Sequence, residues 1–178
     1  MKKIYSDTLF NQISQLIQQA RQQLQRSVNT VMVQTYWQIG RLIIEHEQQG
    51  ESRAAYGKQQ LEQLSARLSA EFGKGFDARN LRNMRAFFQT YPIWNAVRPE
   101  LSWTHYRVLL RVDNPQARDW YMNEAATQHW SSRALERQIG TLYYERLLSS
   151  REKIPVEIEA KTKTAALADD PKEKFFQS

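Results

Sequence analysis

Residues 73–88 read GKGFDARNLRNMRAFF, which predicts a short glycine turn followed by a capped helix. Glycine accepts the left-handed backbone with which helices end, and Asp77 supplies a side-chain oxygen for the free amides at the next helix start. At about 100° per residue this helix has two unlike faces. Its apolar face holds Leu81, Met84 and Phe88, and its polar face holds Arg79, Arg82, Asn83 and Ala86.

The polar face carries the side-chain types that read a DNA major groove. Arginine pairs with guanine edges or phosphates, and asparagine pairs with adenine. A second predicted helix, residues 58–72, precedes the turn, so residues 58–91 form a candidate helix-turn-helix. The competing interpretation is an ordinary surface helix with a solvated charged face. The candidate DNA-binding residues are Arg79, Arg82 and Asn83 toward the groove, Lys74 and Arg85 on phosphates, and Arg107 from a later helix.

The charge of the chain favours a polyanionic partner. The 178 residues carry a net charge of +6, and residues 152–178 hold five lysines against six acids, so residues 1–151 carry +7. The length predicts one domain with its own core. The sequence has no cysteine, which excludes disulfides and thiolate metal sites. Its three histidines lie far apart without a second ligand at a useful spacing, so no metal site or cofactor is expected.

No stretch of the sequence predicts a membrane span or a secretory signal. No window approaches the roughly 18 apolar residues that a spanning helix needs. The first seven residues, MKKIYSD, begin with two lysines but are followed by no unbroken apolar run. We therefore expect a soluble, cytoplasmic protein.

Residues 6–49 carry one apolar stripe at helical spacing. Apolar residues recur in steps of three and four from Leu9 to Leu42, with glutamines on the opposite surface. This pattern predicts either one very long helix or a helical hairpin broken near residues 27–30. A lone helix cannot bury such a stripe, so it must pack on the rest of the domain or on another chain. A homo-oligomer formed through the N-terminal helix is therefore a candidate assembly.

The rest of the chain also reads as helical. Glycine and proline number only six and five, and no segment alternates apolar and polar residues convincingly. Further helices are predicted over 103–112, from 115 to about 129, and from 131 or 132 to about 147. The fold class is therefore all-α, with a long N-terminal helix or hairpin on a helix-turn-helix core that has room for a small wing. Residues 1–150 form the domain, and residues 151–178 read as a linker or disordered tail.

Two other patterns in the sequence resemble functional sites. Glu159-Ala160-Lys161 has the Glu-x-Lys form of a nuclease metal site, but no apolar strand precedes it, so it is assigned to the tail. Trp103, with His105 and Arg107 nearby, offers a surface on which bases could stack. Aromatic residues at helical spacing are more often core residues, because they bury so much apolar area.

Several motifs, in order, resemble the N-terminal domain of the YhcG-like nucleases, the family that carries the domain of unknown function 1016. The resemblance covers roughly residues 6–150. It implies a helix-turn-helix or winged-helix DNA-binding module that precedes a nuclease domain of the PD-(D/E)xK type. The family's catalytic positions would lie beyond Ser178, so it implies no catalytic residue and no enzymatic activity for this chain. The alternative function is a helical protein–protein interaction or dimerisation module. The motifs are YWQIGR (36–41), AYG (55–57), FGKGF (72–76), NLRNMR (80–85), LSWTHY (101–106) and LERQI (135–139).

Overall fold

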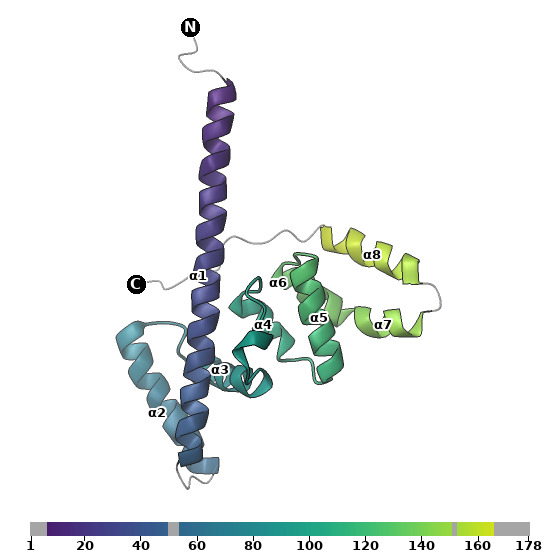
Figure 1. Cartoon of the computed structure of the whole chain (residues 1–178). Coiled ribbons are helices and arrows are strands. Elements are labelled where there is room, and N and C mark those ends of the chain that lie inside the picture. The colour runs from purple at the N-terminus through teal and green to yellow at the C-terminus, as the bar shows by residue number, and fades with distance from the viewer. Residues whose placement is uncertain (1–6, 50–53, 151–152, 166–178) are drawn as a thin grey trace.

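The computed structural model describes residues 7–49, 54–150 and 153–165, and it confirms an all-α fold (Figure 1). These residues form eight α-helices and one short 3₁₀ turn, Trp94–Ala96, and they contain no strand. A wing is therefore absent from the described part of the chain. The helices are α1 (Asp7–Gln49), α2 (Ala54–Phe72), α3 (Ala78–Thr90), α4 (Trp103–Leu109), α5 (Pro115–Thr127), α6 (Ser132–Gly140), α7 (Tyr143–Ser149) and α8 (Lys153–Ala165).

The N-terminal segment is one continuous helix, which settles the choice between a long helix and a hairpin broken near residues 27–30. The 43 residues of α1 correspond to a length of roughly 65 Å. Its second half lies against the other helices, whereas its first half extends away from them (Figure 1). The buried residues of α1 all lie in the second half: Val33, Tyr36, Trp37, Gly40, Ile43 and Ile44.

Helix α3 crosses α1 at Gly40, where the two backbones come very close. A Cβ atom added to Gly40 would lie 2.0 Å from the carbonyl oxygen of Met84 and 3.1 Å from Cβ of Phe88. Only a residue without a side chain fits this approach. Beside it, the Trp37 indole packs edge-on against Phe88 at a centroid distance of 5.1 Å. The same indole donates a 2.7 Å hydrogen bond from Nε1 to the carbonyl oxygen of Tyr91.

The inner side of α3 packs into an aromatic cluster shared with α4. Leu81, Met84 and Phe87 are fully buried. The Phe87 ring lies 4.7 Å from that of Tyr106 and 5.4 Å from that of Trp103, measured between centroids. The Tyr106 hydroxyl donates to the Arg98 carbonyl oxygen at 2.9 Å, and burial raises the pKa of this tyrosine. The aromatic residues thus form the core, as their helical spacing favours.

Two predictions about the C-terminal part of the chain need correction. The expected last helix is two helices, because Leu142 adopts a left-handed backbone with φ of 54° between α6 and α7. Residues 153–165, assigned to a linker or tail, form α8. Its Ala160 is buried, and the buried Gln138 of α6 donates a 3.0 Å hydrogen bond to the Ala160 carbonyl oxygen. Residues 166–178 lie outside the described residues.

Substitution of Gly40 by alanine tests the close crossing of α1 and α3. The added Cβ would overlap the Met84 carbonyl, so the helices must separate, and we expect a loss of about 3 kcal/mol in the free energy of unfolding. Urea denaturation followed by circular dichroism measures this loss.

Gly57→Ala is the matched control. Gly57 lies within α2, and a Cβ there meets nothing within 4 Å. Because alanine has the higher helix propensity, this variant should gain about 0.5–1 kcal/mol. Equal stability of the two variants would contradict the close approach at Gly40.

Candidate nucleic-acid interface

The turn before α3 is fixed by backbone conformation and by two capping contacts. Gly73 and Gly75 have φ of 80° and 108°, a region that glycine adopts without strain. Asp77 caps α3 by accepting a 2.8 Å hydrogen bond from the backbone amide of Asn80. The Asn80 side chain in turn donates to the Gly75 carbonyl oxygen and accepts from Nε1 of Trp103 at 3.1 Å. Asn80 therefore ties the turn to α4.

The polar face of α3 points away from this core. Arg79 and Arg82 are exposed, and Asn83 is half-buried beside them. Lys74 is exposed in the turn that precedes the helix. Five of the six predicted residues, all except Arg107, thus lie on the turn or on α3, and four of them (Lys74, Arg79, Arg82 and Asn83) lie away from its buried side. The positions of Arg79, Arg82 and Asn83 agree with the polar face expected from the helical period.

Arg85, predicted to hold a phosphate, joins α3 to α1 in the structure. Its Nε donates to both carboxylate oxygens of Glu47, at 3.0 and 2.8 Å, and its Nη2 lies 2.8 Å from one of them. Its Nη1 donates to Gln89 at 3.1 Å. The Glu47 carboxylate balances the charge of the Arg85 guanidinium, and the hydrogen bonds to Glu47 and Gln89 involve all three of its nitrogen atoms. These contacts link α3 to α1. Nothing in the local sequence signals this pair, because Glu47 is 38 residues away.

Arg107 lies on α4, apart from the α3 face, and is half-buried. Its Nε is enclosed and has no hydrogen-bond partner in the structure. Its neighbours in the sequence are core residues, with Trp103 5% exposed and His105 7% exposed. Ser102 caps α4 by accepting from the backbone amide of His105, and Nδ1 of His105 accepts from the backbone amide of Ser102. Nε2 of His105 lies 2.8 Å from the Trp130 carbonyl oxygen. The structure therefore does not assemble Trp103, His105 and Arg107 into a base-stacking surface.

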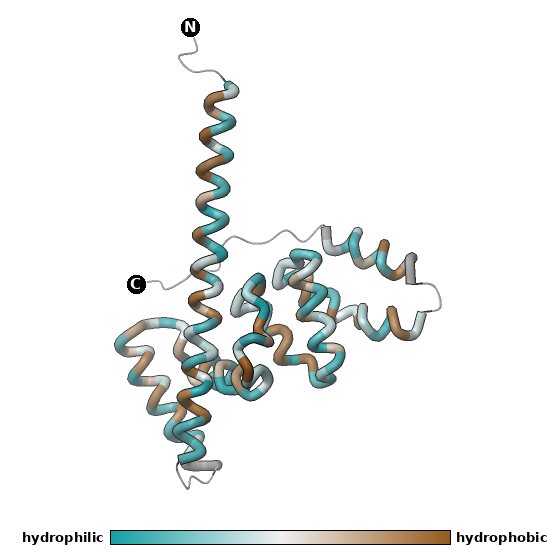
Figure 2. The backbone as a smooth tube through the Cα atoms, in the orientation of Figure 1, coloured by the Kyte–Doolittle hydropathy of each residue, from teal (hydrophilic) through white to brown (hydrophobic). Residues whose placement is uncertain are grey.

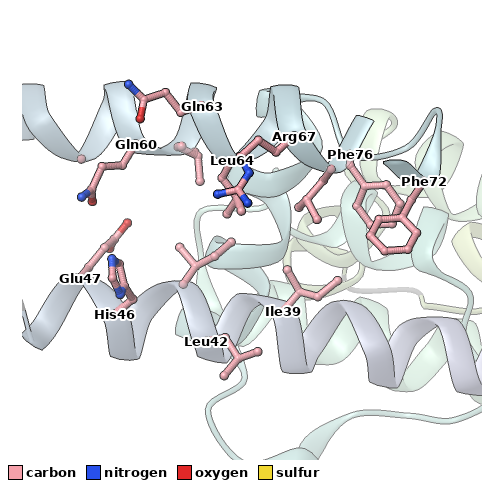
Figure 3. A pocket seen from close by; sticks show the side chains of 14 residues that line it. Ile39, Leu42, His46, Glu47, Gln60, Gln63, Leu64, Arg67, Phe72 and Phe76 are labelled. Atoms are coloured by element: carbon pink, nitrogen blue, oxygen red, sulfur yellow. The ribbon is translucent and has the colours of Figure 1, made fainter. Parts of the chain in front are cut away.

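A groove lies between the second half of α1 and α2, next to the candidate interface (Figure 3). Its volume is about 800 Å³. His46 and Glu47 point from α1 toward Gln60 at one end, and Phe72 and Phe76 line the other. The exposed lining is mostly apolar. Such a groove suits an apolar side chain or helix better than the phosphate backbone of a nucleic acid.

Glu159, from the Glu159-Ala160-Lys161 triplet, is paired with two cationic side chains. Lys163 and Arg146 both donate to its carboxylate, and these hydrogen bonds lower the pKa of Glu159. The triplet lies on helix α8, where Ala160 is buried, so it does not form the strand that such a metal site uses. Within the described ranges, no group of three or more His, Asp or Glu side chains could hold a metal ion.

None of the helices in residues 7–49, 54–150 and 153–165 is long and apolar enough to cross a membrane.

Comparison with known proteins identifies the family. The DUF1016 N-terminal domain model matches residues 12–146. The protein named "Putative nuclease YhcG" of Escherichia coli (strain K12) is 38% identical over 173 residues, which cover 79% of this chain and 46% of that protein. The chain therefore spans about half the length of this relative. No solved structure is significantly similar to it. The chain belongs to the DUF1016 N-terminal domain family.

Proposed function

We propose that this domain binds duplex DNA through the outer face of α3. The observation that carries the proposal is the one-sided burial of this helix. Leu81, Met84 and Phe87 are fully buried, while Arg79 and Arg82 remain exposed on the other side. A helix held rigidly on one side with arginines on the other is suited to enter a major groove.

In this proposal Arg79, Arg82 and Asn83 face the groove, and Lys74 contacts phosphate at the preceding turn. Arg85 is assigned to the α1–α3 junction, and Arg107 is left out because it lies on α4 with an enclosed Nε. The net charge of +7 over residues 1–151 supports a polyanionic partner. The name of the relative, a nuclease, supports a nucleic acid as that partner.

The proposed role is binding, with catalysis supplied by another part of the nuclease system. The family resemblance assigns no catalytic residue to this chain. A protein-interaction module is the second candidate function. It is favoured by the apolar side chains exposed along the first half of α1, among them Phe10 and Leu24.

An Arg79→Ala, Arg82→Ala, Asn83→Ala triple variant should lose most of its affinity for DNA. If both arginines contact phosphate, the slope of log affinity against log salt should fall by about 1.8, since each released counterion contributes about 0.9. Fluorescence anisotropy of a labelled duplex across a salt series measures both quantities. Arg82→Ala alone should remove about half of this change in slope.

The matched control is Arg133→Ala with Arg137→Ala. These two arginines are exposed on α6, so the variant loses the same charge from another face. The control should retain the affinity and the salt slope. If this control lost salt-sensitive binding while the α3 variant retained it, the interface would lie on α6. Absence of binding by the unmodified protein at low salt would favour the protein-interaction module.

Arg85→Ala tests whether Arg85 stabilises the junction of α1 and α3 or contacts DNA. Loss of the pair with Glu47 should cost about 1 kcal/mol because both side chains are partly exposed, which corresponds to a fall of roughly 2–4 °C in Tm. The salt slope of DNA binding should stay unchanged. A slope lowered by about one counterion would instead return Arg85 to the DNA interface.

A further inference from the structure

The first half of α1 carries an apolar seam with a seven-residue period. Phe10, Ile17, Leu24 and Val31 follow one another at intervals of seven residues, and they occupy the a positions of three successive heptads and of the start of a fourth. The d positions hold Ile13, Ala20 and Ser27. A repeat of apolar a and d positions is typical of coiled coils, in which each of these side chains inserts between four residues of a partner helix. Here the repeat is apolar at every position except Ser27.

The seam is open to solvent along its whole length. Contact between α1 and the rest of the domain begins near Thr30, whose hydroxyl lies 3.3 Å from the Pro99 carbonyl oxygen. Before that point α1 extends away from the other helices, with apolar residues at intervals along it (Figures 1 and 2). A contiguous apolar surface of this kind marks an interaction site. The exposed fractions are Phe10 69%, Ile13 48%, Ile17 49%, Leu24 65% and Val31 62%.

The seam ends where the domain core begins. The next four seam positions are polar or charged: Gln34, Gln38, Arg41 and Glu45. The first buried residue of α1 is Val33, and at about 100° per residue the core-facing side lies nearly opposite the seam. The seam therefore lies apart from the core-facing side of α1. Only its last positions, Ser27 and Val31, come close to the domain, where they line a small hollow with Phe76.

We propose that a second copy of this chain packs along the seam, forming a parallel two-stranded coiled coil over residues 10–31. These 22 residues span roughly 33 Å of helix, along which the a, d, e and g positions face the partner. The seam is complementary to a second copy of itself. In a parallel, in-register pair, the a and d side chains of one helix pack against the a and d side chains of the other.

The charges favour the parallel alignment. Arg21 and Arg26 are the only charged residues between Phe10 and Val31. In a parallel pair, Arg21 at an e position lies beside the g position of the second copy, which is an uncharged Leu16. In an antiparallel pair centred on the seam, the two Arg21 residues would meet as like charges. A parallel pair places the two domains at the same end of the coiled coil. The proposed dimer does not depend on DNA binding.

Single cysteines test both the assembly and its direction, because the native sequence has no cysteine. Phe10→Cys and Leu24→Cys place the thiol at a positions, where in a parallel pair each residue faces its own copy. Each variant should form a disulfide-linked dimer when air or oxidised glutathione accepts the electrons. Gln22→Cys, at the exposed f position on the opposite side of α1, is the control and should stay monomeric in denaturing electrophoresis.

Sedimentation of the unmodified protein gives an independent readout. It should be a dimer, and Leu24→Glu should raise the dissociation constant by at least about a hundredfold, since the seam would enclose two unpaired carboxylates. Leu24 is exposed in the single chain, so the unfolding temperature of the hydrophobic core should not change. A protein that remains monomeric up to roughly 100 µM would overturn the proposal. Cross-linking of Phe10→Cys only when mixed with Val31→Cys would equally overturn it, because that pairing requires antiparallel helices.

Discussion

The crossing of α1 and α3 at Gly40 is the contact on which the rest of the structure depends. The Gly40 backbone lies so close to the Met84 carbonyl that no side chain fits between them. This approach brings Trp37 onto Phe88 and Tyr91, and it brings Glu47 within reach of Arg85. Three contacts of different kinds (close backbone packing, an aromatic pair and a charged pair) thus fix α3 in position and in rotation about its axis.

Because one side of α3 is packed against α1 and α4, the residues on its opposite side face outward. Leu81, Met84 and Phe87 are enclosed by α1 and α4, so Arg79 and Arg82 must point outward. The turn before α3 adds to this order, since Asn80 bridges Gly75 and Trp103. A helix whose polar face is held in place loses little conformational entropy when it binds a ligand. The same junction leaves the first half of α1 outside the domain, and an exposed apolar seam follows from that division.

The sequence allowed the helices to be predicted more fully than their contacts. The cap at Asp77, the glycine turn and the faces of α3 follow from local rules that the structure confirms. The Arg85–Glu47 pair could not be predicted, because it depends on how α1 and α3 cross. The break between α6 and α7 has a local signal in Gly140, at the end of α6, but the predicted helix ran through it. The left-handed backbone lies at Leu142, a residue type that rarely adopts it. Helix α8 was missed because its Lys- and Glu-rich composition conceals one buried position, Ala160, which packs at Gln138.

Amide hydrogen exchange across a dilution series tests the central claim, that the Gly40 crossing divides α1 into a core half and an open half. The account predicts the slowest exchange at residues 33–44 of α1 and 81–87 of α3 at every concentration. Residues 10–31 should exchange rapidly in dilute protein and more slowly as the concentration rises. Equal protection along the whole of α1 at the lowest concentration, or rapid exchange throughout α3, would contradict the account.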